Sequence, residues 1–310
     1  LALHLRGNNI FMDMYDDAKY VKDLLAFCGK IAMKMSDMFI DAGMAVIAAV
    51  DPLISQISVD HFEEFMSPIY TEIFEHIRSK AVLSSFFVCG DATRNIEAMC
   101  ETNPDSIFVD ENVDLAAAKR ITDKYNITIG GNLPLTTVML HGTQQDNMKC
   151  VIDELDSIQD RHNLVIAPGC DMPYDTPIES TIGIVQAIYN EADVREMLKD
   201  YTNVEEEIEV ELPNYEILKK PLIEVFTLDS ATCAACTYMM GAAEAAKDYF
   251  GDEIDMMEYK YTVKENIARI KKMGVPNLPS MYINGELKYR SIIPSREELF
   301  KAIKEAKGSI

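Results

Sequence analysis

Basic residues are scarce in this sequence of 310 amino acids. Lysine and arginine together number 29 against 51 aspartates and glutamates, and the formal net charge at pH 7 is −22. A surface this negative repels phosphate backbones, which argues against nucleic acid as a partner. Long apolar runs are also missing. No stretch approaches ~18 uninterrupted apolar residues, so we expect no segment to span a membrane.

Cysteine is sparse and histidine sparser. The seven cysteines are odd in number and widely spread, unlike a secreted disulfide framework. The chain also opens without the charged start, apolar core and cleavage site of a signal peptide. The cysteine usage leads us to expect a reducing cytoplasm. The five histidines have no ligand-like spacing; they are His4, His61, His76, His141 and His162.

Hydrophobic residues, at 48% of the chain, are numerous enough for a sizeable core. In the first 200 residues, apolar runs of strand length alternate with helical patterns. Such alternation indicates βα repeats and a parallel sheet, and five units are visible. The strand-like runs cover 42–52, 81–90, 106–112, 127–134 and 164–173.

The sequence pattern changes after residue 200. Residues 201–219 are acidic and include a proline and an alternating IEVEL, which predicts a linker with one strand. From 220 to 310 the order of patterns is β-α-β-α-β-β-α. A hairpin is expected around Asn284-Gly285, and a capping box, Ser295 with Glu298, is expected to open the last helix. We therefore predict domains at 1–200 and 220–310.

A Cys-x-x-Cys pair, Cys233 and Cys236, lies directly after a predicted strand and at the first turn of a helix. Free N–H groups and the helix dipole stabilise a thiolate there and lower its pKa. Cys236 lies one turn further on and is placed to resolve a mixed disulfide. This pattern is typical of a catalytic redox dithiol.

With LPSMYINGE, the Cys-x-x-Cys pair makes residues 220–307 resemble the thioredoxin/glutaredoxin-like fold. In that family a cis-proline precedes the third strand and faces the dithiol. The resemblance places this role on Pro279, six residues before Gly285. It implies a thioredoxin-like α/β domain with Cys233, Cys236 and Pro279 as catalytic residues.

In the first 200 residues, Cys89 ends the second strand-like run and Cys170 ends the fifth. In a (β/α)₈ barrel the carboxyl ends of all strands open on one face, so two such thiols can converge on one metal ion. Zinc is favoured by thiolates and takes a third protein ligand. Polar residues at other strand ends are expected to line the same mouth; they are Asp51, Asp110, Glu111 and Asn132. Of these, Asp51, Asp110 and Asn132 are the candidates for substrate binding.

Residues 1 to about 195 resemble the uroporphyrinogen decarboxylase superfamily, and more closely its methylcobamide:thiol methyltransferase branch. The stretches that carry the resemblance are DPLISQIS, HFEEFMSP, VCGD, VDENVDLAAAK, GGNLP with HGT, and APGCDMPYDTP. In that branch a His-x-Cys-Gly motif and a Gly-Cys hold zinc. The zinc activates a thiol, which attacks the methyl group of a methylated corrinoid. The resemblance implies methylcobamide on a corrinoid protein as donor and a small thiol as acceptor.

The sequence departs from this family pattern at one ligand. Phe87 stands where the family has its histidine, two residues before Cys89. Phenylalanine cannot bind a metal, so either another group supplies the third ligand, with Asp91 and Glu111 as candidates by position, or the site is not a normal zinc site. The predicted metal ligands are therefore Cys89, Cys170, Glu111 and Asp91.

The family barrel also has eight strands, and the resemblance begins after its third. We therefore predict a partial (β/α)₈ TIM barrel of the C-terminal five βα units, incomplete at its N-terminus and with two open hydrophobic edges, followed by the thioredoxin-like domain. Four functions stay open. They are methyl transfer with a redox domain that keeps the thiols reduced or presents Cys233, thiol-disulfide exchange through Cys89 and Cys170, porphyrinogen decarboxylation, and binding without catalysis.

Overall fold

The computed structural model describes residues 1–7, 9–202, 208–231 and 233–308. The chain divides into two compact units, of which the first is Leu1–Thr202 and the second takes up the rest. Among the residues described, no helix has both the length and the apolar character needed to cross a membrane.

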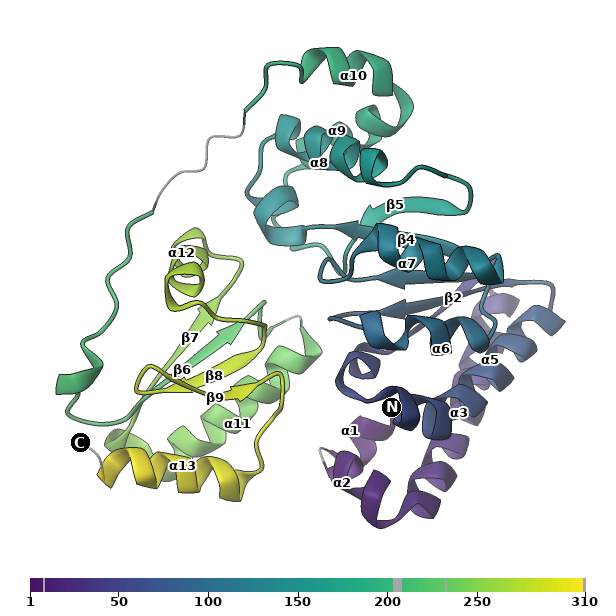
Figure 1. The fold of residues 1–310 in the computed structure, drawn as a ribbon. Coiled ribbons are helices and arrows are strands. Elements are labelled where there is room, and N and C mark those ends of the chain that lie inside the picture. The colour runs from purple at the N-terminus through teal and green to yellow at the C-terminus, as the bar shows by residue number, and fades with distance from the viewer. Residues whose placement is uncertain (8, 203–207, 232, 309–310) are drawn as a thin grey trace. The chain divides into compact units, whose positions relative to one another are not determined.

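The first unit contains one five-stranded sheet in which every neighbouring pair of strands is parallel. The strands lie side by side in chain order, so each strand leads through a crossover to the next one along (Figure 1). This is the arrangement of part of a (β/α) barrel, and the prediction of five βα units is confirmed. The strands are β1 (Val46–Val50), β2 (Leu83–Val88), β3 (Ser106–Val109), β4 (Thr128–Leu133) and β5 (Leu164–Pro168).

Helices between the strands bury their apolar stripes against the sheet. Helix α5 (Ser67–Ser79) shows the pattern, because its buried residues Tyr70, Ile73, Phe74 and Ile77 recur at helical spacing. The Tyr70 ring lies 4.3 Å from the ring of Phe86 on β2. The other helices of this unit are α1 (Ala2–Arg6), α2 (Asn9–Asp16), α3 (Ala18–Asp41), α4 (Val59–His61), α6 (Ile96–Glu101), α7 (Leu115–Thr122), α8 (Gln144–Ser157), α9 (Ile178–Tyr189) and α10 (Glu191–Met197).

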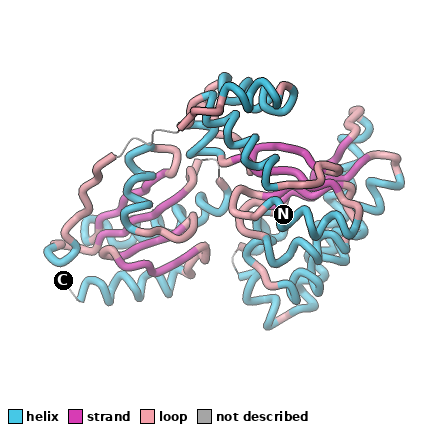
Figure 2. The backbone as a smooth tube through the Cα atoms, turned by 45° about the horizontal axis from the view of Figure 1, so that its top comes forward, coloured by secondary structure: helices cyan, strands magenta, loops and turns pink. Residues whose placement is uncertain are grey.

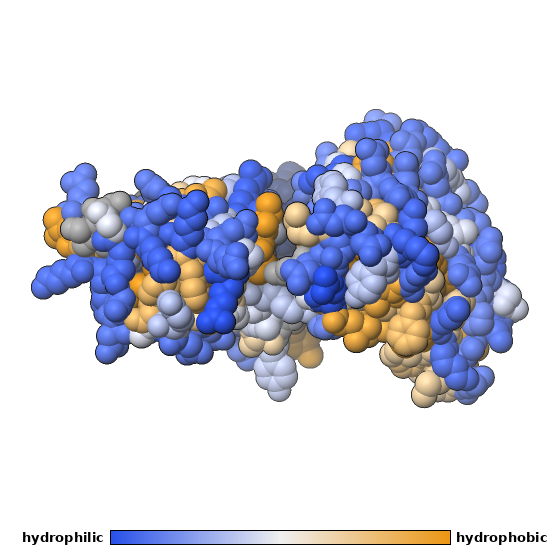
Figure 3. All heavy atoms as spheres, turned by 90° about the horizontal axis from the view of Figure 1, so that it is seen from below, coloured by the Kyte–Doolittle hydropathy of each residue, from blue (hydrophilic) through white to orange (hydrophobic). Residues whose placement is uncertain are grey.

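The sheet of the first unit is open within the described residues, because β1 and β5 each have a strand on one side only. Apolar side chains of these edge strands reach the surface: Val46 and Val50 on β1 are 51% and 58% exposed, and Val165 on β5 is 40% exposed. Apolar side chains also reach the surface elsewhere, within a largely hydrophilic face (Figure 3). The expectation of two open hydrophobic edges is confirmed.

Among the described residues, the second unit is a four-stranded sheet in the order β7-β6-β8-β9 with three α-helices, labelled in Figure 1. Figure 2 shows strands and helices in a second view. Strand β6 runs parallel to β7 and antiparallel to β8, and β9 is antiparallel to β8. The predicted order β-α-β-α-β-β-α is confirmed. The elements are β6 (Leu222–Thr227), α11 (Ala234–Phe250), β7 (Asp255–Lys260), α12 (Lys264–Met273), β8 (Ser280–Ile283), β9 (Glu286–Arg290) and α13 (Arg296–Gly308).

Local signals in the second unit explain its turns. Asn284 and Gly285 have φ values of 52° and 79°, so both adopt the left-handed backbone that a tight two-residue hairpin requires. Before α13, the Ser295 hydroxyl accepts from the Glu298 backbone N–H at 3.3 Å. The Glu298 carboxylate accepts in return from the Ser295 N–H at 2.9 Å. The predicted hairpin and capping box are both confirmed.

The strand expected within 201–219 is wrong for the described part of that segment. Residues 203–207 lie outside the described residues, and 208–214 form no strand. The carbonyls of Val210 and Glu211 accept instead from side chains of α12, Lys272 and Arg269. These two carbonyls therefore have hydrogen-bond donors without a neighbouring strand.

Candidate functional site

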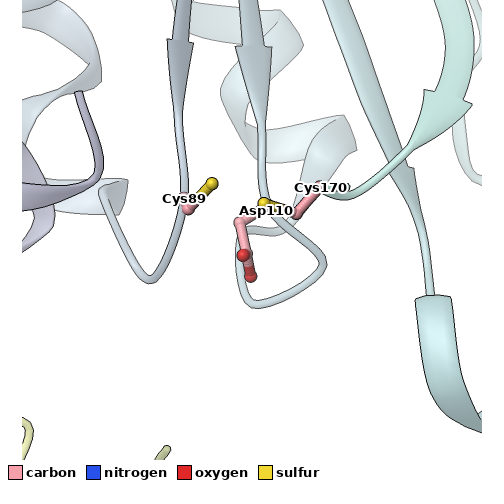
Figure 4. A group of neighbouring side chains, drawn as sticks. All are labelled: Cys89, Asp110 and Cys170. Carbon is pink, nitrogen blue, oxygen red and sulfur yellow. The ribbon is translucent and has the colours of Figure 1, made fainter. Parts of the chain in front are cut away.

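Three side chains converge at the carboxyl ends of the first unit's strands. Cys89 follows β2, Asp110 follows β3 and Cys170 lies just beyond β5. Their ligand atoms, two sulfurs and one carboxylate oxygen, all lie within 4.8 Å of one another. In Figure 4 the sulfur of Cys89 points across toward the Cys170 side chain, which comes in from the loop after β5. Residues far apart in the sequence thus form one group with the composition of a metal site.

Two glycines let these loops close. Gly90, directly after Cys89, has a φ of 81°, and a Cβ there would lie 2.8 Å from the Ser55 hydroxyl. Gly169, directly before Cys170, lies against the backbone of Glu111, where a Cβ would come within 2.8 Å of the amide nitrogen. Any side chain at either position forces the loop outward. The Cys-Gly and Gly-Cys pairs are therefore geometric requirements of the convergence.

Asp110 is held in place by two asparagines. Its carboxylate accepts from the backbone N–H of Asn112 at 2.9 Å and also from the Asn112 side chain. Its backbone carbonyl accepts from Nδ2 of Asn132 at 2.8 Å, and the same Nδ2 donates to the carbonyl of Val113 at 2.5 Å. The turn after β3 is thus fixed at both ends. Because both donors of the Asn132 amide are used, only its oxygen remains for contact with a substrate.

The electrostatics of the group disfavour negative charge. A hydrogen bond with Cys170, burial, and the charges of Cys170 and Asp110 raise the pKa of the Cys89 thiol. A second thiolate beside the first is therefore costly unless a cation balances it. Two sulfurs and a carboxylate are a donor set that zinc accepts, so the residues present fit the metal implied by the family resemblance.

The candidates for a third ligand lie differently from what position alone suggests. The group found among the described residues contains Asp110, and it contains neither Asp91 nor Glu111. The Asp91 carboxylate accepts from the backbone and hydroxyl of Thr93 at 3.1 and 2.6 Å. Glu111 accepts from the Leu135 N–H at 2.6 Å, and burial raises its pKa to about 7. All three carboxylates accept local hydrogen bonds, and Asp110 is the one that has an oxygen within 4.8 Å of both sulfurs.

Asp51, predicted as a substrate-binding residue, caps the turn after β1. One carboxylate oxygen accepts from the Leu53 N–H at 3.1 Å, and the other accepts from the Tyr70 hydroxyl at 2.8 Å. Burial raises the pKa of Asp51. Contact between Asp51 and a substrate remains a prediction.

The dithiol of the second unit is built within one turn of helix. Cys233 occupies the N-cap position of α11, and Cys236 is fully buried in its first turn. A hydrogen bond with Cys233, followed by burial, raises the pKa of Cys236. The Leu228 N–H donates to the Cys236 sulfur at 3.3 Å. The peptide bond between Leu278 and Pro279 is cis, as expected from the resemblance.

Glu258, on β7, is a residue that the sequence analysis missed. One of its oxygens accepts from the Thr227 hydroxyl at 2.6 Å and from the Ser230 N–H at 3.2 Å. These two residues flank Leu228, whose N–H reaches Cys236. Glu258 therefore holds the turn that approaches the buried thiol. Only the pairing of β6 with β7 brings it there, and no motif marks it.

Comparison with known proteins agrees with this division of the chain. The family model "Uroporphyrinogen decarboxylase (URO-D)" matches residues 4–190. Methylcobamide:CoM methyltransferase MtbA of Methanosarcina acetivorans is 26% identical over 193 residues, which are 61% of this chain and 55% of that protein. The chain thus spans only about half the length of this curated relative. A solved structure described as a methyltransferase from Methanosarcina mazei shares the fold, with a TM-score of 0.56 at 18% identity, over 62% of this chain and 56% of that one.

The remaining part of the chain has a different relative. A probable thioredoxin of Methanothermobacter thermautotrophicus is 39% identical over 83 residues, which are 27% of this chain and 92% of that protein. The match covers nearly all of the small protein. The chain therefore belongs to the uroporphyrinogen decarboxylase family and carries, in addition, a thioredoxin-family domain.

Proposed function

We propose that the chain takes part in methyl transfer from a methylated corrinoid, carried by a partner protein, to a small thiol. The observation that carries the proposal is the convergence of Cys89, Asp110 and Cys170 within 4.8 Å at the strand ends of a uroporphyrinogen decarboxylase family fold. The similarity to methylcobamide:CoM methyltransferases supports this choice of reaction within the family.

In this proposal Cys89, Asp110 and Cys170 hold a zinc ion, with Asp110 in place of the histidine whose position Phe87 takes. Zinc bound there lowers the pKa of a coordinated thiol, so that the thiolate is present at neutral pH. The asparagines at 112 and 132 hold the Asp110 carboxylate and its turn in place, and a carboxylate oxygen lies within 4.8 Å of both sulfurs. Both cysteines are half-buried, so their sulfurs remain within reach of a small molecule.

In the proposed reaction the main task of the protein is to hold the acceptor thiol and the methyl group in position. The sulfur of the acceptor thiol bonds to the methyl carbon, the electron pair of the carbon–cobalt bond stays on the corrinoid, and the thiol proton passes to solvent. We assign substrate contacts in the mouth to Asp51 and to the free oxygen of Asn132. The open strand edges offer no catalytic group, and we assign them no role in the reaction.

Metal analysis of the purified full chain tests the proposal. We expect one zinc per chain, lost in Cys89→Ser and in Cys170→Ser. Cys150→Ser is the matched control, because Cys150 is half-buried in the same unit but lies outside the group. The double variant Cys233→Ser/Cys236→Ser shows whether the other dithiol binds metal. Zinc that persists at full stoichiometry in both single variants rules out the site.

Porphyrinogen decarboxylation is the second candidate, because the matching family model is described by that reaction. It needs neither metal nor thiol, so it predicts CO₂ release that survives Cys89→Ser. The two candidates are separated by two assays of the same protein: demethylation of methylcobalamin with a small thiol as acceptor, and CO₂ release from a porphyrinogen. Turnover only in the second assay would favour decarboxylation.

A further inference from the structure

The two thiols at the strand ends lie close together. The sulfurs of Cys89 and Cys170 are within 4.8 Å of each other, and both cysteines are half-buried and free of a disulfide. Two thiols this close can react in two alternative ways. They can hold a cation together, or their sulfurs can join at about 2.05 Å in a disulfide. A sulfur in a disulfide carries no charge to offer a metal, so the two states exclude each other.

The same chain carries a second dithiol, Cys233 and Cys236, with the arrangement of a thiol-disulfide exchange site. Cys233 is partly exposed at the start of α11, and Cys236 is buried one turn on and hydrogen-bonded to it. Such a pair donates two electrons when it forms its own disulfide, with the exposed sulfur attacking first.

We propose that Cys89 and Cys170 form a reversible disulfide, and that this disulfide is a substrate of the Cys233–Cys236 dithiol, on the same chain or on a second copy. The disulfide state releases the metal, and exchange restores the pair that binds it. The part of the proposal that concerns metal release rests on the function proposed above. The part that concerns thiol-disulfide exchange rests only on the two thiol pairs.

The steps balance in atoms and electrons. A low-molecular-weight disulfide oxidises the pair: Cys89 and Cys170 lose two protons and two electrons, and the small disulfide becomes two thiols. In the return step the Cys233 thiolate attacks one sulfur of the Cys89–Cys170 bond, and the other leaves as a thiolate and takes a proton. Cys236 then attacks Cys233, which releases the second thiol and leaves a Cys233–Cys236 disulfide. An external dithiol regenerates that disulfide to thiols.

The local charges suggest which probe to use. Asp110 and Asp171 both act on the Cys89 thiol, so an anionic oxidant is repelled from it. The neutral bis(2-hydroxyethyl) disulfide is therefore a suitable oxidant for the full chain after removal of metal with a chelator. Alkylation of the remaining thiols and peptide mass spectrometry then identify the cysteines that are joined.

We expect a Cys89–Cys170 disulfide that forms in the metal-free protein and forms more slowly after zinc is added. With limiting dithiothreitol, we expect its reduction to be slower in Cys233→Ser/Cys236→Ser than in the wild type, on the order of tenfold. Cys150→Ser is the control and should match the wild type. In Cys236→Ser, which cannot resolve the intermediate, a mixed disulfide of Cys233 with Cys89 or Cys170 should accumulate.

Two results overturn the inference: no Cys89–Cys170 disulfide in the oxidised protein, or equal reduction rates in the wild type and the double variant with no mixed disulfide in Cys236→Ser. Either result leaves zinc binding and methyl transfer untouched. Conversely, normal exchange in a protein that binds no zinc when it is reduced and supplied with the metal contradicts the proposed metal site and supports the proposed exchange. The two failures are therefore distinguishable in the same set of variants.

Discussion

The two cysteine pairs of this chain are built in opposite ways. Cys233 and Cys236 are neighbours on one helix, so their proximity is fixed as soon as α11 begins at Ala234. Cys89 and Cys170 meet only when β2, β3 and β5 stand in one sheet and the loops beyond them close. The local pair is suited to repeated conversion between two thiols and a disulfide. The assembled pair adds Asp110 from a third strand end, which suits a metal.

The largest expected effect is a complete separation of two properties: zinc binding, which depends on Cys89 and Cys170, and dithiol activity, which depends on Cys233 and Cys236. Cys89→Ser should abolish zinc binding, because one sulfur and one carboxylate make a weak zinc site. The same variant should keep full dithiol activity, measured as reduction of a small disulfide. Cys233→Ser should show the opposite pattern. Loss of both properties in either variant would show that the pairs are not independent.

A smaller effect is expected from the third member of the group. Asp110→Asn removes a charged ligand and should weaken zinc binding, by about 10- to 100-fold on the scale seen for groups that support a metal site. Competition with a chromogenic chelator measures this affinity. Glu111→Gln is the matched control, since its carboxylate binds the Leu135 N–H instead. Equal losses of zinc affinity in both variants would mean that the total negative charge near the strand ends matters, rather than the Asp110 carboxylate in particular.

In the second unit, Glu258→Gln should alter the Cys233–Cys236 dithiol without abolishing it. The change weakens a carboxylate's bonds to Thr227 and Ser230, a loss of roughly 1–2 kcal/mol in the turn that approaches Cys236. We expect a several-fold change in the dithiol equilibrium with a reference thiol pair. Glu265→Gln, on the exposed start of α12, serves as the comparison variant and should have no effect. An unchanged dithiol equilibrium in Glu258→Gln would show that the turn does not depend on the hydrogen bonds of the Glu258 carboxylate.

The smallest effect concerns stability alone. Ser295→Ala removes the hydroxyl that caps α13 and should destabilise the second unit by about 1 kcal/mol. Urea unfolding followed by a probe in that unit measures the loss. The zinc content of the first unit should stay unchanged. A drop in zinc content would reveal coupling between the units.

The sequence was sufficient wherever periodicity or a short motif determines structure. The five strands of the first unit, the order of elements in the second, the turn at Asn284-Gly285 and the cap at Ser295 all follow from spacing and turn chemistry. Strand ends were also sufficient to select Cys89 and Cys170 as neighbours across the mouth. In each case the decisive interaction is local, or follows from the rule that parallel strands end on one face.

Side chains in loops were the harder part. Position along the chain favoured Asp91 and Glu111 as third ligands, and Asp110 was assigned to substrate binding. In the structure, Asn112 and Asn132 fix the turn after β3, and an Asp110 oxygen lies within 4.8 Å of both sulfurs. Hydrogen bonds between different strand ends decide this, and periodicity does not encode them. The same reasoning explains why Glu258, set against the dithiol turn by sheet pairing, was overlooked.

The most direct test of the account is an X-ray absorption spectrum at the zinc edge of the reduced Cys233→Ser/Cys236→Ser protein, in which only the assembled pair can supply cysteine ligands close together. The account predicts two sulfur neighbours at about 2.3 Å, with oxygen or nitrogen neighbours at about 2.0–2.2 Å in the remaining positions. A bound zinc without sulfur neighbours, or a protein that binds no zinc at all, would contradict it.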